Sequence, residues 1–233
     1  NIPLVELKKE SKFKIGVISD YLHAEGLDKE VKDSIQNALE ILEKNGNTII
    51  EASFPFLDVM VPTYYVLTTA EASSNLSRFD GVHYGHRSNL AEGVEQTYIK
   101  SRSEGFGKEV KRRIMAGTFV LSQGYYDAYF TQAQKVRRLI SDKTQDIFST
   151  CDVIISPTTS STAFKINSVT DPVEMYLQDK FTVHANLSGN PAISIPLGVH
   201  SNGMPFGIQI MANVSDEEVL FKMASNIENL LNN

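Results

Sequence analysis

Apolar and polar residues along the chain follow two periods, which predict where strands and helices form. Residues 14–19 are a short apolar run rich in β-branched side chains, which is typical of a strand. Residues 28–44 carry apolar side chains at helical spacing and are followed by Asn45-Gly46, a C-terminal stop signal. Residues 48–52 form a second strand-like run. Strand, helix and strand in this order predict a βαβ unit in a mainly parallel sheet.

The middle of the chain is expected to be helical. Pro62 fits the first turn of a helix through residues 63–75, and further helices are predicted over residues 108–115 and 125–148. We expect the aromatic residues of the last helix to lie in the core and not to form a base-stacking platform, because they share one helix face with aliphatic residues. That face consists of Tyr125, Tyr129, Ala133, Val136 and Ile140.

Strand patterns return in the last third of the chain, at residues 152–156, 192–196 and 206–211. The Asn-Gly pair at 202–203 is a strong turn signal and predicts that the last two strands form a hairpin. Residues 215–218 match a capping box, which predicts a final amphipathic helix. The sequence contains no repeats and no linker-like segment, so the pattern predicts one α/β domain.

Composition limits the class of protein. Of the 233 residues, 42% are hydrophobic and 21% are charged, which excludes disordered and collagen-like proteins. The formal net charge of −6 lacks the basic character of a protein that grips nucleic acid alone, so any RNA is expected to be held by a partner. Cys151 is the single cysteine, which rules out an intramolecular disulfide and favours the cytoplasm; we expect it to be structural.

The residues alone do not complete a catalytic set. The sequence has no Gly-rich phosphate loop, no nucleophile elbow and no zinc-protease motif. His83 and His86 lie three positions apart, which is compatible with metal binding, but a polar loop is the preferred interpretation. Residues 157–162 place hydroxyl side chains directly after a strand, where open α/β sheets gather ligands, although such runs are also typical of turns. The pattern therefore indicates either a ligand-binding edge or a turn.

Five segments together resemble the amidase-signature family, and within it the glutaminase subunits of tRNA-dependent amidotransferases. The first two segments are specific to those subunits, and the last two are shared with amidases more widely. The segments are SSNLSRFDG at 73–81, SEGFGKEVKRRI at 103–114, GYYDAY at 124–129, PTT and TAF within 157–164, and NLSGNPAIS at 186–194.

The resemblance implies a mixed, twisted sheet flanked by helices and a Ser–cis-Ser–Lys catalytic triad. In the family both serines lie in a Gly/Ser-rich stretch and the lysine lies upstream of it, before the region that Asn1 resembles. No such stretch occurs in this sequence. Residues 1–233 are therefore expected to be the C-terminal half of a single amidase-signature domain, a fragment that is inactive alone.

For the intact enzyme, the resemblance implies a carbon–nitrogen ligase with glutamine as amide donor. The glutaminase subunit, termed A, hydrolyses glutamine through a seryl ester. The released ammonia passes to the B subunit, where Glu-tRNA(Gln) is activated by ATP and converted to Gln-tRNA(Gln). A small C subunit clamps the other two subunits in a heterotrimer. ATP and Mg then belong to the partner, and no cofactor is expected in this chain.

The resemblance also implies which residues recognise glutamine. Arg113 matches the arginine that binds the α-carboxylate, Asp179 matches the acid that takes the α-ammonium group, and Tyr64 matches a tyrosine near the substrate. Each has a second interpretation from the residues alone: Arg113 as a helix arginine whose stem covers an apolar face, Asp179 as an exposed helix acid, and either Tyr64 or Tyr65 as a core residue.

The sequence departs from the family at several positions around the pocket. Residues 183–185 are Val-His-Ala, whereas an apolar residue or Pro is common in the family at this place, and Ser160 and Asn190 also replace commoner residues. Two further hypotheses stay open. The chain is either part of an amidase-signature hydrolase of another amide, which would not need the Arg113 and Asp179 pair, or a naturally short, non-catalytic binding module.

Overall fold

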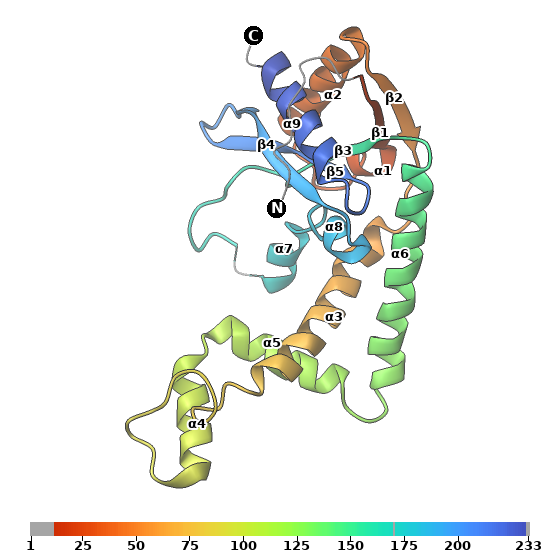
Figure 1. The fold of residues 1–233 in the computed structure, drawn as a ribbon. Coiled ribbons are helices and arrows are strands. Elements are labelled where there is room, and N and C mark those ends of the chain that lie inside the picture. Colours follow the sequence, from red (N-terminus) through yellow and green to blue (C-terminus); the bar gives the residue numbers. More distant parts are fainter. Residues whose placement is uncertain (1–11, 170, 232–233) are drawn as a thin grey trace. The chain divides into compact units, whose positions relative to one another are not determined.

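The computed structural model describes residues 12–169 and 171–231. Their contacts divide the chain into two compact units. Unit 1 combines Asn1–Val61 with Arg137–Asn233, and unit 2 is Pro62–Val136. Two helices, α3 (Leu57–Leu76) and α6 (Gln132–Phe148), carry the chain from one unit to the other (Figure 1).

Unit 1 is built on a mixed five-stranded sheet with the strand order β2-β1-β3-β5-β4. Strand β1 pairs in parallel with β2 and β3, whereas β5 pairs antiparallel with β3 and β4. Helices flank the sheet, as the resemblance implies, so the expected fold class is confirmed. The strands are β1 (Lys14–Ile18), β2 (Thr48–Ala52), β3 (Val153–Pro157), β4 (Ala192–Val199) and β5 (Pro205–Ala212).

The predicted βαβ unit is present, with α2 (Lys29–Lys44) between the parallel strands β1 and β2. Its first turn is capped by Asp28, whose side chain accepts hydrogen bonds from the backbone N–H groups of Glu30 and Val31 at 2.8 and 3.1 Å. The chain leaves the helix through Gly46, whose φ of +92° is a conformation that favours glycine. Both ends of the helix are therefore fixed by local sequence.

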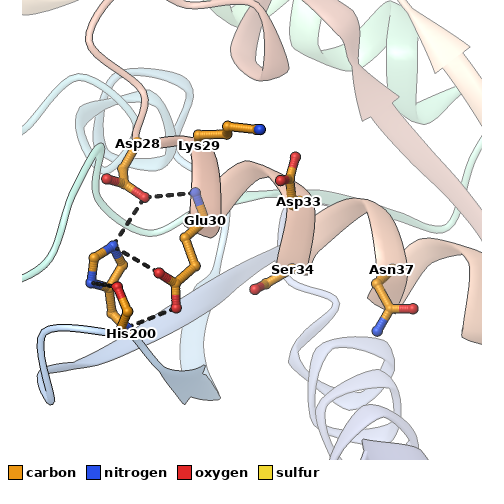
Figure 2. Close-up of a pocket in the computed structure, with 8 residues that line it drawn as sticks. Asp28, Lys29, Glu30, Asp33, Ser34, Asn37 and His200 are labelled. Atoms are coloured by element: carbon orange, nitrogen blue, oxygen red, sulfur yellow. Dashed lines mark hydrogen bonds and ion pairs between the residues drawn. The ribbon is translucent and has the colours of Figure 1, made fainter.

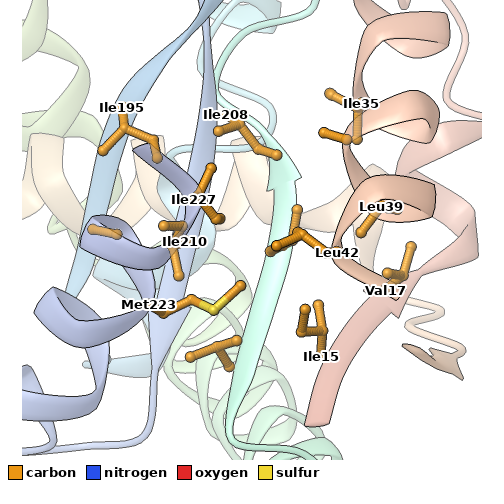
Figure 3. Close-up of a cluster of buried hydrophobic side chains, with 14 of the residues drawn as sticks. Ile15, Val17, Ile35, Leu39, Leu42, Ile195, Ile208, Ile210, Met223 and Ile227 are labelled. Carbon is orange, nitrogen blue, oxygen red and sulfur yellow. The ribbon is translucent and has the colours of Figure 1, made fainter. Parts of the chain in front are cut away.

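The core of unit 1 lies between the sheet and the two helices α2 and α9 (Glu217–Leu231). Figure 3 shows Leu39 and Leu42 of α2 facing side chains of the strands, with Met223 and Ile227 of α9 packed beside them. Burying one such side chain contributes about 1.5–3 kcal/mol, so this layer holds the sheet in place. Fully buried members include Ile15, Ile35, Leu42, Val153, Ile208, Ile210, Met223 and Ile227.

Three short helices of unit 1 have no counterpart in the predicted pattern. They are α1 (Ser19–Leu22), α7 (Pro172–Leu177) and α8 (Val183–Ser188). None is longer than six residues, so none shows enough of the helical period to be recognised in sequence. The final helix was predicted with the correct type but the wrong cap: it begins at Glu217, and Asp216 is the residue whose side chain accepts from the N–H of Val219.

Unit 2 is helical and contains the end of α3, α4 (Gly93–Gly105), α5 (Lys108–Val120) and a π-helix, η1 (Tyr126–Thr131). Helices α3 and α5 touch at Gly117, where a Cβ atom would lie 1.9 Å from the backbone oxygen of Thr69. A residue with a side chain does not fit this crossing.

Both predicted helices are longer than expected. The helix predicted over 108–115 extends to Val120, and the helix predicted over 63–75 begins earlier, at Leu57.

The expectation that the aromatic residues of the helix over 125–148 lie in the core was wrong. Tyr125 and Tyr129 are each 44% exposed, whereas Ala133 and Ile140 are buried. The physical reason is the π-helix, whose wider turn breaks the helical period before residue 132. The two tyrosines instead cluster with Phe119 of α5, at ring-centroid distances of 4.2 and 5.8 Å.

Within the described ranges, no helix is both long and apolar enough to cross a membrane.

Candidate functional site

The carboxyl end of β3 in unit 1 carries the hydroxyl-rich loop, residues 157–162. The Thr158 hydroxyl lies 2.6 Å from that of Ser194 on β4, which ties the loop to the sheet. Thr159 donates to the backbone oxygen of Ser161 at 2.7 Å, which closes the loop on itself. Two strands and one polar loop therefore form a single polar edge, and some of its hydroxyls make turn contacts at the same time.

The segment that carries Asp179 is fastened to this edge on both sides. Before Asp179, the side-chain oxygen of Gln178 accepts from the hydroxyls of Ser160 and Ser161, at 3.2 and 3.5 Å. After it, the backbone oxygen of Phe181 accepts from the buried Gln209 of β5 at 3.3 Å. Asp179 therefore lies beside the carboxyl end of β3, and it is partly buried.

Asp179 lies in the turn just before the next helix, α8. Its backbone oxygen accepts from the N–H of Val183, the first residue of α8, at 3.1 Å, and from the Thr182 hydroxyl at 3.1 Å. The helix ends at Gly189, whose φ is +82°. The Asn-Leu-x-Gly segment thus closes a short helix whose first residue, Val183, is hydrogen-bonded to Asp179.

In unit 2, α5 presents Arg113, whose side chain is one-third exposed. Its Nε donates to a carboxylate oxygen of Glu109 at 3.1 Å, and Arg112 donates to the other oxygen at 2.7 Å. The guanidinium carbon of Arg113 lies 5.3 Å from the ring centroid of Tyr65. Partial burial lowers the pKa of Arg113, but the hydrogen bond to Glu109 and neighbouring groups outweigh it, so the pKa is raised and the guanidinium stays charged.

The structure places Tyr65 against Arg113, and Tyr64, which the resemblance implies to lie near the substrate, is its neighbour. Tyr64 packs edge-on against Tyr65, with ring centroids 5.3 Å apart and planes at 90°. Sequence reasoning therefore missed two partners of Arg113. Glu109 could have been found from its spacing of four residues on one helix face, whereas Tyr65 comes from α3 and had no local signal.

The candidate residues thus fall into two groups. Unit 2 brings together Arg113, Glu109 and Tyr65, with Tyr64 beside them, and unit 1 holds Asp179 at the polar edge. Their joint action on one ligand stays a prediction.

A pocket of about 590 Å³ lies elsewhere in unit 1, at the start of α2 (Figure 2). Three of its polar side chains are paired with one another: Nε2 of His200 lies 3.3 Å from a carboxylate oxygen of Asp28 and 3.3 Å from one of Glu30. The pKa of Asp28 is lowered, chiefly by the N–H of Val31 and further by Glu30 and His200, against a smaller opposing effect of burial. These contacts join the β4–β5 turn to α2, and we interpret them as a structural clasp.

The clasp also supports the hydroxyl-rich loop. The N–H of Asp28 donates to the backbone oxygen of Ser160 at 2.8 Å, and the side-chain amide of Asn202 donates to the Thr162 hydroxyl at 2.9 Å. Residues 157–162 are therefore hydrogen-bonded to the start of α2 and to the β4–β5 turn, the same elements that the clasp joins.

The two loop histidines have separate partners. His83 lies 2.8 Å from a carboxylate oxygen of Asp80, and His86 lies 2.9 Å from one of Glu104. In the part of the chain that the structure describes, no group of three or more His, Cys, Asp or Glu side chains could hold a metal ion. The Cys151 thiol is buried, which raises its pKa to about 11, and this agrees with a structural role.

Comparison with known proteins identifies the family. Residues 4–221 match the family model described as Amidase. The chain belongs to the amidase-signature family. This confirms the resemblance that rests on the five sequence segments, and it agrees with the mixed sheet flanked by helices.

Relatives within the family are similar over nearly the whole chain. The A subunit of glutamyl-tRNA(Gln) amidotransferase from Fusobacterium nucleatum is 49% identical over 223 residues, which are 95% of this chain and 45% of that protein. Its counterpart in Clostridium botulinum (strain Kyoto / Type A2) is 50% identical over 216 residues, 92% of this chain and 44% of that protein. The chain therefore spans less than half the length of these curated relatives.

Solved structures give the same picture. The crystal structure of the glutamyl-tRNA(Gln) amidotransferase A subunit from Thermotoga maritima matches with a TM-score of 0.71 and 39% identity, over 94% of this chain and 42% of that one. A crystal structure described as an amidase matches with a TM-score of 0.75 at 20% identity, over 97% of this chain and 48% of that one. The second likeness shows the fold alone.

Proposed function

We propose that this chain forms the glutamine-recognition side of the glutaminase subunit of a tRNA-dependent amidotransferase. The observation that carries the proposal is the 49–50% identity with proteins described as the A subunit of glutamyl-tRNA(Gln) amidotransferase, over more than nine-tenths of this chain. The intact enzyme would use glutamine as an amide donor and convert Glu-tRNA(Gln) to Gln-tRNA(Gln).

The candidate residues match the chemistry of the ligand. Free glutamine carries a carboxylate and an ammonium group on one carbon, so a selective site needs a cation and an anion. A planar guanidinium such as that of Arg113 can hold a carboxylate through two parallel hydrogen bonds, which an ammonium group cannot do. Asp179 would accept the ammonium group, and Tyr64 would lie near the substrate. Two arginines, Arg112 and Arg113, share the single carboxylate of Glu109, so this trio retains one positive charge.

Catalysis would need residues that this chain does not supply. A serine hydroxyl attacks the side-chain amide carbon of glutamine and expels ammonia, and water then cleaves the ester to give glutamate. In the family the two serines and the lysine lie in a Gly/Ser-rich region and upstream of it, and this sequence has no such region. We therefore propose that the chain alone binds glutamine poorly and does not hydrolyse it.

The partners follow from the same proposal. The B subunit would bind ATP, Mg and Glu-tRNA(Gln), and the C subunit would join the assembly, giving a heterotrimer. The net charge of −6 supports this division, since an acidic chain repels the phosphate backbone of tRNA.

The decisive experiment removes the guanidinium group of Arg113. Arg113→Ala in the complete glutaminase, assayed within its complex, should raise the KM for glutamine by about 10- to 100-fold, because a charge-assisted hydrogen bond contributes about 1.5–3 kcal/mol. Steady-state ammonia release measures this effect. The KM of Arg113→Lys should lie between those of Arg113→Ala and the parent protein. Lysine keeps the positive charge but cannot form the two parallel hydrogen bonds of a guanidinium.

A matched control is available in the next residue. Arg112→Ala removes the same charge from the same helix turn and from the same Glu109 contact, and should change KM by less than about threefold if it only sits on the surface. Equal effects of the two substitutions would contradict a specific role for Arg113. A higher kcat/KM for simple aliphatic amides than for glutamine would favour another amidase-signature hydrolase.

A further inference from the structure

Helix α8 is fastened to α6 by side chains on one face of α6. Arg137 donates from Nε to the backbone oxygen of Leu187 at 3.1 Å, and the Ser141 hydroxyl donates to that of Ser188 at 3.4 Å. One turn further on, the Thr144 hydroxyl lies 2.7 Å from Nε2 of His184. Positions 137, 141 and 144 have the spacing of a single helix face, so the three contacts lie on the same side of α6.

His184 is the buried centre of this contact. The residue is 1% exposed, its Nδ1 lies 2.6 Å from the Tyr21 hydroxyl, and its ring lies 4.4 Å from that of Phe54. Burial lowers its pKa to about 3, so the ring is neutral at physiological pH. A buried, neutral imidazole with a partner on each nitrogen is fixed in position and in orientation.

One placement of the protons satisfies these contacts together. With the Thr144 hydroxyl donating to the backbone oxygen of Ile140 at 2.7 Å, its oxygen accepts from Nε2 of His184, and Nδ1 accepts from the Tyr21 hydroxyl. In this arrangement the ring donates from Nε2 and accepts at Nδ1, so both of its nitrogens are hydrogen-bonded.

The hydrogen-bond network of His184 is close to Asp179 in sequence, and a backbone hydrogen bond connects Asp179 to the helix that carries His184. His184 is in the first turn of α8, and the backbone oxygen of Asp179 accepts from the N–H of Val183, the first residue of that helix. Phe181, between them, is fully buried and packs against Tyr21 at a ring-centroid distance of 5.4 Å. A shift of His184 would therefore move the backbone that carries the Asp179 carboxylate.

We propose that His184, held by Tyr21 and Thr144, is a positioning residue that sets the Asp179 carboxylate for the α-ammonium group of an amino-acid amide. This inference rests on the proposed function and deepens it. His184 would thereby contribute to selectivity for amides that carry an α-ammonium group over amides that lack one, without touching the substrate.

The test compares glutamine with glutaramate, which has the same amide and carboxylate but lacks the α-ammonium group. His184→Phe keeps an aromatic ring and removes both hydrogen bonds. In the complete glutaminase within its complex, it should lower the ratio of kcat/KM for glutamine to that for glutaramate by about tenfold, as expected for a misplaced charge-assisted contact. The loss should lie mainly in the KM for glutamine.

Two further variants separate positioning from general damage. His184→Gln can donate to Thr144 and accept from Tyr21, and should keep the ratio within about threefold of the parent protein. Tyr21→Phe removes one hydrogen bond at constant shape, and should lower the ratio in the same direction as His184→Phe. If His184→Phe does not yield folded protein, the Tyr21→Phe ratio decides the question alone.

A double substitution shows whether the effect passes through the carboxylate. Asp179→Asn should lower the ratio, and adding His184→Phe to it should lower the ratio no further. Equal losses for both substrates, an unchanged ratio, or full additivity with Asp179→Asn would overturn the role of His184. If Asp179→Asn itself leaves the ratio unchanged, the proposed glutamine site is wrong, and that result is distinguishable from a failure of His184 alone.

Discussion

At the scale of single residues, the buried His184 makes the stability of the fold depend on pH. Its pKa is lowered from 6.5 to about 3 by burial, so the unfolded chain binds a proton at this ring in a range where the folded chain does not. The stability that the neutral ring contributes is complete above pH 6.5 and is lost as pH falls from there toward 3. The loss is about 1.4 kcal/mol per pH unit within that range.

Urea unfolding curves measured at several pH values between about 7.5 and 5 check this prediction. Carboxylates add their own pH dependence, so the informative quantity is the difference between the parent protein and His184→Gln, which has no ring to titrate. The parent protein should lose more stability than the variant on acidification. Parallel curves for the two proteins would show that the ring is not kept neutral by the fold.

Some residues of the candidate site could be predicted from the sequence, and others could not. Arg113 and Asp179 were singled out because they match family motifs, and Glu109 was detectable from its helical spacing. His184 was noticed only as a departure from the family, because its partners lie 163 and 40 positions away and no local pattern connects them. The contact between Tyr65 and Arg113 had no local signal in the sequence, because the two residues lie on different helices, α3 and α5.

At the scale of elements, the crossing of α3 and α5 depends on one glycine. A methyl group at Gly117 would meet the backbone oxygen of Thr69 at 1.9 Å, and a backbone atom cannot move aside as a flexible side chain can. Gly117→Ala should therefore force the helices apart and destabilise unit 2 by about 1–3 kcal/mol or more, since overpacked contacts cost that much. Thermal unfolding followed by circular dichroism measures the change.

Gly107→Ala is the matched control for this substitution. Gly107 precedes the same helix, α5, and a Cβ atom there would meet nothing within 4 Å. Its replacement should lower stability by no more than about 1 kcal/mol, because glycine is a better helix N-cap than alanine. Helix propensity alone favours alanine at position 117, so a Gly117→Ala variant that is no less stable than Gly107→Ala would contradict the need for glycine at the crossing.

Elements were predictable where a period ran long enough. The strands and the long helices with an apolar face were found, because each repeats its pattern over several turns or a whole strand. Helix α4 was missed because its polar residues hide the period, and α8 because six residues hold less than two turns. The π-helix was mistaken for the start of α6, since its sequence gives no sign of the wider turn.

At the scale of the whole molecule, unit 2 interrupts unit 1 in sequence. Residues 62–136 lie between the two parts of unit 1, so the sheet joins strands from both sides of this insertion. Lys14 and Asp152, at the start of the neighbouring strands β1 and β3, are hydrogen-bonded across 138 positions at 2.7 Å. The family match covers residues 4–221 and therefore includes the inserted unit 2.

This connectivity has a kinetic consequence. Contacts within unit 2 close short loops, whereas β1 can meet β3 only after a loop of more than a hundred residues has been closed, which is entropically costly and slow. We expect amide protons of α5 to become protected before those that bond β1 to β3 when the unfolded chain is returned to native conditions, as pulsed hydrogen exchange can show. Simultaneous protection would contradict this order. A newly made chain would then hold the β3-facing edge of β1 unpaired until β3 arrives, and that edge would be the part of the β1–β2 unit most in need of a chaperone.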